Sequence, residues 1–270
     1  MNDVNASIDH LRRDDGLDGR VAVITGAASG IGRALASAYA RAGTNVVLGY
    51  YSGDAHDVNK VVSEVEAIGG KAIAVDVDVR DSSSVDSLFD TAVNHFGRLD
   101  IAVAGAANIH RSAIGDMTDE TWHGLLDIDL TGVMRTVRAA TQTMSGPGAI
   151  VAVSSFLGPV VGWNDNSHYA AAKAGVLGMV RSLAVELAPR QIRVNALIPG
   201  LIRTPQTLDP VNSLGSDGLD GAGGSIIPWG RVGTADEAAR AIRFLTSDDS
   251  SFVTGQQIVV DGGMTVRWAW

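Results

Sequence analysis

Residues 20–32 read RVAVITGAASGIG, and this stretch decides the fold. The apolar run Arg20–Thr25 has the composition of a buried strand, and a helical pattern begins at Ile31. Between them, glycines let the backbone turn sharply and approach a pyrophosphate, while the helix N-terminus offers free N–H groups and a partial positive charge. The order strand, loop, helix favours a dinucleotide-binding loop over an ordinary turn. The residues expected at the cofactor are Gly26, Ser29, Gly30, Ile31 and Gly32.

Outward from this loop, short apolar runs alternate with helical patterns along the chain. Strands are expected at 20–25, 44–50, 71–75, 99–104, 148–154, 192–197 and 256–260, and helices at 31–42, 58–68, 84–96, 121–144 and 169–188. Because the strands are nearly all apolar, helices should cover both faces of a parallel sheet. Right-handed crossovers then predict the α/β class, as a single-domain, Rossmann-like doubly wound sheet in three α/β/α layers.

The domain limits follow from composition. Residues 1–18 are polar and are expected to form a flexible N-terminal extension, with one catalytic domain over 19–270. Within that domain, residues 205–229 carry five glycines between Gly215 and Gly224, so this segment is not expected to be a firm helix throughout. Because it follows a strand end, where open sheets bind ligands, a substrate lid is favoured over a plain surface loop.

Composition excludes several classes of function. The 270 residues carry a net charge of −9 and no basic block, so nucleic acid is not an expected partner. The absence of cysteine excludes disulfides and thiolate metal sites, and the six histidines lack metal-ligand spacing. No signal peptide or membrane-spanning run is present, so a cytoplasmic protein acting on a small molecule is expected.

A Tyr-Lys pair supplies the candidate chemistry. Tyr169 and Lys173 are four residues apart and share a helix face. A phenol has a pKa of about 10, too high for a general base near neutrality, but a neighbouring ammonium favours the phenolate. Tyr169 can then exchange a proton with a carbonyl or alcohol oxygen. Ser155, just after an apolar strand, is the expected holder of that oxygen, and Ser154 is the less favoured candidate.

Together these motifs resemble the short-chain dehydrogenase/reductase family, whose cofactor loop reads TGxxxGxG, like Thr25–Gly32. The resemblance runs from about Arg20 to Thr265 and includes a tail with GRVG, TGQ and VDGG motifs. It implies an NAD(P)-dependent oxidoreductase that transfers a hydride between a nicotinamide and a carbonyl or secondary alcohol, with Tyr169 as general acid/base and Ser155 beside it. It also implies a homo-oligomer, a dimer or a tetramer.

The resemblance further implies the cofactor contacts. Asp78 corresponds to the residue that meets the adenine amino group, and the backbone of Val79 to the group that meets the ring. The Pro199-Gly200 turn shapes the nicotinamide site. The remaining residues with implied cofactor contacts are Ala104, Gly105, Ala106, Tyr169, Lys173, Ile202 and Thr204.

Three features depart from the family pattern. The motif NNAG appears as Ala104–Ala107 (AGAA), so both amides are lost. The spacing from Ser155 to Tyr169 is one residue longer than usual, so the intervening loop is expected to have a shape particular to this chain. Trp163 and His168 are candidates to line the substrate pocket.

The third departure is Asp129, which stands where the family's fourth catalytic residue is an Asn. An ionised Asp accepts hydrogen bonds but donates none. Near Lys173 it would raise the lysine pKa and partly offset the effect of the lysine on Tyr169. The hypothesis is that Asp129 substitutes for the Asn and shifts the pH optimum upward.

The end of the second strand bears on cofactor choice. Tyr50 stands where an acidic residue would select NAD, so a 2′-phosphate would not be repelled. Tyr51 and Ser52 offer neutral hydrogen bonds, while Arg33 lies near but follows the loop. NADP(H) is therefore favoured over NAD(H).

Two other functions remain as alternatives. Asp129 and the AGAA segment leave room for a catalytically weakened cofactor-binding sensor, although the Ser, Tyr and Lys are intact. A sugar-nucleotide epimerase would generally need a larger substrate domain and a different glycine spacing. The sequence does not indicate the substrate, and a ketone, a sugar, a steroid and an acyl thioester all stay open.

Overall fold

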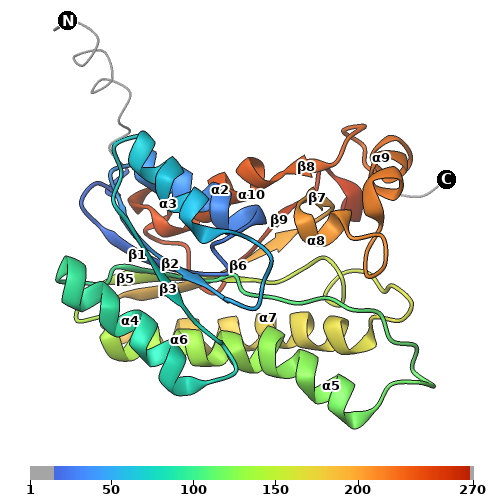
Figure 1. The fold of residues 1–270 in the computed structure, drawn as a ribbon, viewed down its shortest axis with the longest axis horizontal. Helices are drawn as coiled ribbons and strands as arrows, with labels where there is room; N and C mark the ends of the chain where they lie inside the picture. Colours follow the sequence, from blue (N-terminus) through green and yellow to red (C-terminus); the bar gives the residue numbers. More distant parts are fainter. Residues whose placement is uncertain (1–14, 268–270) are drawn as a thin grey trace, which may run out of the picture.

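A computed structural model describes residues 15–267. A twisted parallel sheet forms the centre of the molecule (Figure 1). Within these residues the main sheet has seven strands in the order β3-β2-β1-β4-β5-β6-β9. The strands are β1 (Val21–Thr25), β2 (Asn45–Tyr50), β3 (Ala72–Asp76), β4 (Ile101–Ala104), β5 (Gly148–Val153), β6 (Ile192–Pro199) and β9 (Gln257–Val260). The chain winds outward from β1 to β3 and returns to place β4 beside β1, which creates the crevice where doubly wound sheets bind ligands.

Helices cover both faces of this sheet (Figure 1). One layer holds α2 (Gly30–Arg41), α3 (Val58–Ala67) and α10 (Ala235–Thr246); the other holds α4 (Ser82–Phe96), α6 (Val133–Thr143) and α7 (Ser167–Leu187). Each layer encloses its own apolar core, with Leu35 and Ile242 fully buried in the first and Leu88 and Val176 in the second. The predicted three-layer α/β/α fold is confirmed.

Helix α10 was not predicted, although the sequence contains its signal. The Thr234 side chain accepts a hydrogen bond from the Glu237 backbone N–H, and the Glu237 carboxylate accepts one from the Thr234 backbone N–H. This reciprocal pair is a capping box, which a Thr-x-x-Glu pattern in the sequence predicts. The apolar residues that follow at helical spacing, among them Ile242 and Leu245, are 0% exposed.

The segment 205–229 is more helical than its glycines suggested. It forms α8 (Pro205–Leu208) and α9 (Gly215–Ser225), and all five glycines lie in α9. Leu219 anchors α9 at 0% exposure, and a Cβ on Gly223 would lie 3.1 Å from the Arg231 Cα, so α9 packs closely against the chain at Arg231. Packing therefore outweighs weak helix propensity. Beside α8, the short strands β7 (Ile202–Arg203) and β8 (Gly233–Thr234) pair.

The start of the packed domain differs from the prediction. Residues 1–14 lie outside the described residues, but 15–18 are not a surface extension. Leu17 is 0% exposed, its carbonyl accepts a hydrogen bond from the Thr44 hydroxyl (2.8 Å), and Asp15 pairs with Arg243. The domain therefore includes Asp15. No helix within 15–267 is both long and apolar enough to cross a membrane.

The predicted helix over 121–144 is divided into three parts. It consists of α5 (Asp119–Leu126), a π-helical turn over Asp127–Gly132, and α6. A π turn inserts extra backbone into a helix and occurs often at functional sites. This turn carries Asp129, which is 0% exposed.

Candidate active site

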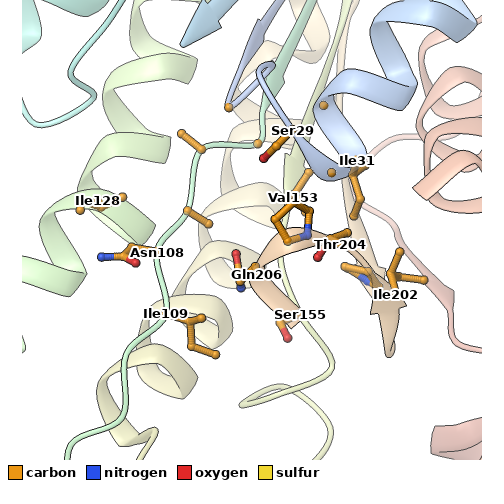
Figure 2. A pocket seen from close by; sticks show the side chains of 18 of the residues that line it. Ser29, Ile31, Asn108, Ile109, Ile128, Val153, Ser155, Ile202, Thr204 and Gln206 are labelled. Carbon is orange, nitrogen blue, oxygen red and sulfur yellow. The ribbon is translucent and has the colours of Figure 1, made fainter. Parts of the chain in front are cut away.

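A cavity of about 610 Å³ opens at the carboxyl ends of the central strands, between the glycine loop and α7. Its size suits a cofactor or small molecule. Figure 2 shows Ser29 from the glycine loop, Ser155 from the end of β5 and Gln206 from α8 around this space. Eighteen of the residues expected in catalysis or at the cofactor line it: Gly26, Ser29, Gly30, Ile31, Gly32, Tyr50, Tyr51, Asp78, Val79, Gly105, Ala106, Ser155, Tyr169, Lys173, Pro199, Gly200, Ile202 and Thr204.

Three of the residues expected in catalysis or at the cofactor do not line the cavity. Ala104 is 2% exposed and pairs with Ala152 inside the sheet. The Ser52 backbone N–H donates to the Asp76 carboxylate (2.9 Å), beside the cavity and not in it. Asp129 lies behind Lys173.

The glycine loop has the close packing that a phosphate cradle requires. Gly26 adopts φ +73°, and a Cβ there would lie 2.9 Å from Ala106. A Cβ on Gly32 would lie 2.2 Å from the Gly26 carbonyl oxygen. Helix α2 begins at Gly30, and the Ser29 side chain makes no capping hydrogen bond, so the first-turn N–H groups remain available to a ligand. These features fit a bound dinucleotide.

At the position where the NNAG amides are lost, one hydroxyl holds the loop after β4. The backbone N–H groups of Gly105 and Ala106 both donate to Thr25 Oγ1, at 3.1 and 3.3 Å. This pair of bonds ties the end of β1 to the loop after β4. Side-chain amides are therefore not needed to hold the two loops together.

The two serines after β5 have different partners. The Ser154 hydroxyl donates to the Lys173 carbonyl (2.8 Å), so it fixes β5 against α7. The Ser155 hydroxyl interacts instead with the phenol of Tyr169 in the cavity. Of the two candidates, Ser155 therefore has the geometry to hold a substrate oxygen beside the tyrosine.

Lys173 connects the tyrosine to the π turn. Its ammonium lies 5.5 Å from the Tyr169 ring centroid, donates to the Val153 carbonyl (3.3 Å), and forms a buried ion pair with Asp129 Oδ2 at 3.0 Å. Burial alone would lower the pKa of Lys173, but the Asp129 carboxylate turns the net direction upward. Burial also raises the pKa of Asp129, against the pull of Lys173.

The pKa of Tyr169 is raised overall, whereas Lys173 alone would lower it. Burial raises the pKa of Tyr169; Lys173 opposes this rise, and the Asp129 charge adds to it. Asp129 therefore opposes the effect of Lys173 on the phenol, as expected, but burial is the largest cause of the raised pKa. A positively charged nicotinamide would act in the same direction as Lys173.

Gln206 and Arg80 were missed by the sequence analysis. The Gln206 side chain, from the segment expected to be a lid, interacts with the Tyr169 hydroxyl. Arg80 ion-pairs with Asp78 (2.6 Å) and reaches the Tyr51 hydroxyl (3.3 Å) at the far end of the cavity. No periodic pattern in the sequence indicates a site role for either residue. The only sign is that Gln206 lies near Thr204 in the chain and Arg80 lies near Asp78.

Of the two residues expected from the longer Ser-to-Tyr loop, one lines the cavity. Trp163 does so. His168 is 0% exposed and faces His110 across 3.2 Å between their Nε2 atoms, so the pocket role expected for it is wrong. Among residues 15–267, no cluster of three or more His, Cys, Asp or Glu side chains could hold a metal ion.

Comparison with known proteins decides the family. A family model described as enoyl-(acyl carrier protein) reductase matches residues 26–265. The chain belongs to the short-chain dehydrogenase/reductase family. This short-chain dehydrogenase/reductase is 43% identical to cis-4-hydroxycyclohexanecarboxylate dehydrogenase of Sinomonas cyclohexanicum, over 91% of this chain and 96% of that protein.

Two further matches cover nearly the whole chain. It is 38% identical to a 3-oxoacyl-(acyl-carrier-protein) reductase of Thermotoga maritima, over 93% of this chain and 99% of that protein. A short-chain type dehydrogenase/reductase from Mycobacterium marinum superimposes with a TM-score of 0.85 at 36% identity, over 93% of this chain and 97% of that one. The family supports NAD(P)-dependent oxidoreduction.

Proposed function

We propose that this enzyme transfers a hydride between a nicotinamide cofactor and a carbonyl or secondary alcohol, with Tyr169 as general acid/base. The observation that carries the proposal is the meeting of Ser155 and Tyr169 in the same cavity as the glycine loop. When bound, the cofactor supplies or accepts the hydride. The residues named below handle the proton and hold the substrate oxygen.

The proton chemistry belongs to Tyr169. In reduction its hydroxyl gives a proton to the carbonyl oxygen, and in oxidation it takes the alcohol proton. The Ser155 hydroxyl holds that oxygen, and Gln206 contributes a second polar group at the same point. Lys173 stabilises the phenolate through its charge.

NADP(H) is the favoured cofactor. Tyr50 places no carboxylate at the end of β2, where one would repel a 2′-phosphate. The Arg80 guanidinium lies over the Tyr51 ring at 5.7 Å and supplies a cation at this end of the cavity. Both arginines are ion-paired, Arg33 with Glu64 and Arg80 with Asp78, but of the two only Arg80 lines the cavity.

The substrate end of the cavity favours an apolar carbonyl compound. Ile109, Leu157 and Trp163 form an apolar wall that packs next to Tyr169. A ring or an alkyl chain beside the reacting carbonyl would bury against this wall, in keeping with the cyclic and acyl substrates named for the two relatives.

Turnover tests the proposal. NADPH and NADH oxidation is followed at 340 nm with 4-oxocyclohexanecarboxylate, a 3-oxoacyl thioester, a ketosteroid and a keto sugar. We expect turnover with at least one apolar carbonyl, faster with NADPH. Absence of turnover with every compound would overturn the proposal.

A cofactor-binding sensor is the second candidate. The observation that favours it is the burial of Tyr169 together with the Asp129 charge, both of which raise the phenol pKa. Tight cofactor binding by fluorescence with no turnover between pH 6 and about 10, where a phenol ionises, would select this function.

A further inference from the structure

The substrate end of the cavity offers polar side chains but no uncompensated charge. Within residues 15–267, the charged side chains that line the cavity are Asp54, Asp78, Arg80 and Lys173. Arg80 pairs with Asp78 and reaches the Tyr51 hydroxyl, and the Asp54 backbone N–H donates to the Tyr51 carbonyl (3.0 Å). These three charges therefore lie at the far end of the cavity. Lys173 is paired with Asp129, so a substrate beside Tyr169 meets no free charge.

The arginine beyond the apolar wall is also paired. Arg111 follows Ile109 by two residues, but it does not line the cavity, and its guanidinium forms an ion pair with the Asp165 carboxylate at 2.8 Å. His110, next to it, faces His168 and does not line the cavity either. A carboxylate on the substrate would thus lose its water without gaining a counter-ion. Proteins avoid this arrangement because an unpaired charge is costly to bury.

Ser213 supplies a free hydroxyl to this cavity. It lies between α8 and α9, lines the cavity and is only 9% exposed. Its hydroxyl makes no hydrogen bond to any residue within 15–267. Because nearly all buried polar side chains have a partner, a nine-tenths buried hydroxyl at an open cavity is placed to bind a ligand.

A bonded turn fixes the position of Ser213. The Asp209 carboxylate accepts hydrogen bonds from the backbone N–H of Val211 (2.8 Å) and from the Asn212 side-chain amide (2.8 Å). The Ser213 backbone N–H donates to the Asp209 carbonyl (3.0 Å). The Asn212 side-chain oxygen accepts from the Arg111 backbone N–H (3.4 Å). This last contact joins the turn to the loop after β4, which contributes to the apolar wall, so Ser213 belongs to the substrate end.

We propose that the substrate is a neutral ketone or secondary alcohol with a second hydrogen-bonding oxygen, and that the Ser213 hydroxyl binds this second oxygen. The inference rests on the proposed function, since Ser155 and Tyr169 hold the oxygen that reacts. The apolar wall packs against the carbon skeleton between the two oxygens. The second oxygen belongs to an uncharged group, such as a hydroxyl, a ketone, an ester or an amide, and not to a carboxylate or a phosphate.

Ser213 acts on specificity and takes no part in the proton transfer. A hydroxyl donates to a carbonyl oxygen and accepts from an alcohol, so it suits each of these neutral groups. A site that offers a hydrogen bond discriminates against an analogue without the matching group, because the buried hydroxyl is then left unpaired. The absence of a counter-ion discriminates against a charged analogue. Together these two effects define the preferred class of substrate.

The binding of three 4-substituted cyclohexanones tests the inference without turnover. The compounds are 4-oxocyclohexanecarboxamide, 4-methylcyclohexanone and 4-oxocyclohexanecarboxylate, which share the ketone and differ in having a neutral polar, an apolar or a charged substituent. Calorimetry at pH 8 measures each Kd with the full-length protein saturated with NADP+ or NAD+, which has no hydride to give. We expect the carboxamide to bind about tenfold more tightly than the methyl compound, and the carboxylate to bind most weakly. Equal Kd values, or tightest binding of the carboxylate, would overturn the proposal.

Ser213→Ala tests whether this hydroxyl causes the preference. The variant should bind the carboxamide no better than the methyl compound, whose own Kd should not change. Ser216→Ala is the matched control, because Ser216 is exposed on α9 and does not line the cavity. If Ser213→Ala keeps the tenfold preference, the proposal is wrong. If wild type shows the expected order of binding but turns over no carbonyl compound, the proposed function fails while the role of Ser213 stands.

Discussion

At the scale of single residues, Asp129 controls the charge beneath the tyrosine. Burial raises the pKa of Tyr169, Lys173 opposes that rise, and the Asp129 carboxylate adds to it. Asp129→Asn removes the negative charge, so the phenol ionises at lower pH. We predict that the rise of the oxidation rate with pH moves to lower pH in this variant. Asp127→Asn, in the same π turn but partly exposed and paired with Arg135, is the matched control. An unchanged pH–rate profile would refute the role of Asp129.

The Lys173–Asp129 pair also predicts a stability effect. Lys173→Met leaves the fully buried Asp129 without its counter-ion, which typically costs roughly 3–5 kcal/mol. Combining it with Asp129→Leu should recover most of this loss in urea unfolding. Since burial raises the folded-state pKa of Asp129, the stability of Lys173→Met should increase as pH falls through that pKa. Equal stability of wild type and Lys173→Met would contradict this account.

Arg80 carries the prediction for cofactor choice. Arg80→Gln should raise the KM for NADPH about tenfold, equivalent to about 1.4 kcal/mol, and leave that for NADH nearly unchanged. Arg33→Gln is the control, because Arg33 is engaged by Glu64 outside the cavity. If both cofactors respond equally to Arg80→Gln, the guanidinium does not select the 2′-phosphate.

At the scale of elements, the glycine loop and α2 depend on close backbone contact. Gly32→Ala places a Cβ 2.2 Å from the Gly26 carbonyl, so α2 must move away from the loop. We predict loss of cofactor binding and about 2 kcal/mol of stability. Gly124→Ala is the contrast: a Cβ on this α5 glycine meets nothing within 4 Å, and it should stabilise by about 0.5–1 kcal/mol. Calorimetry and cofactor fluorescence measure both effects.

Some of the helices and strands could be predicted from the sequence and others could not. Apolar runs such as Val21–Thr25 predict buried strands because both sheet faces are covered, and Tyr169 with Lys173 is predictable because helix spacing alone aligns them. Helix α9 was not predictable, since it is held by the packing of Leu219 with Leu201, Ile227 and Val232 and not by its own helix propensity. The π turn at Asp129 has no local pattern either. The capping box of α10 was readable and was missed.

At the scale of the whole molecule, α7 exposes a stripe of small and apolar residues that is interrupted by Arg181. Its outward positions include Ala171, Ala174, Gly178 and Val185, the last 77% exposed. We predict a homodimer or homotetramer in which this stripe packs against another copy. Val185→Glu should shift sedimentation toward the monomer, whereas Ile68→Glu, at the end of α3, should not. A wild-type protein that sediments only as a monomer would remove this prediction.

The most direct test of the central claim compares Tyr169→Phe with wild type on the best carbonyl substrate. The phenylalanine keeps the ring against Lys173 but loses the hydroxyl that exchanges the proton with the substrate oxygen. The account predicts a fall in kcat of roughly 10²–10⁴-fold with cofactor affinity nearly unchanged. A variant that retains wild-type kcat would contradict Tyr169 as the general acid/base.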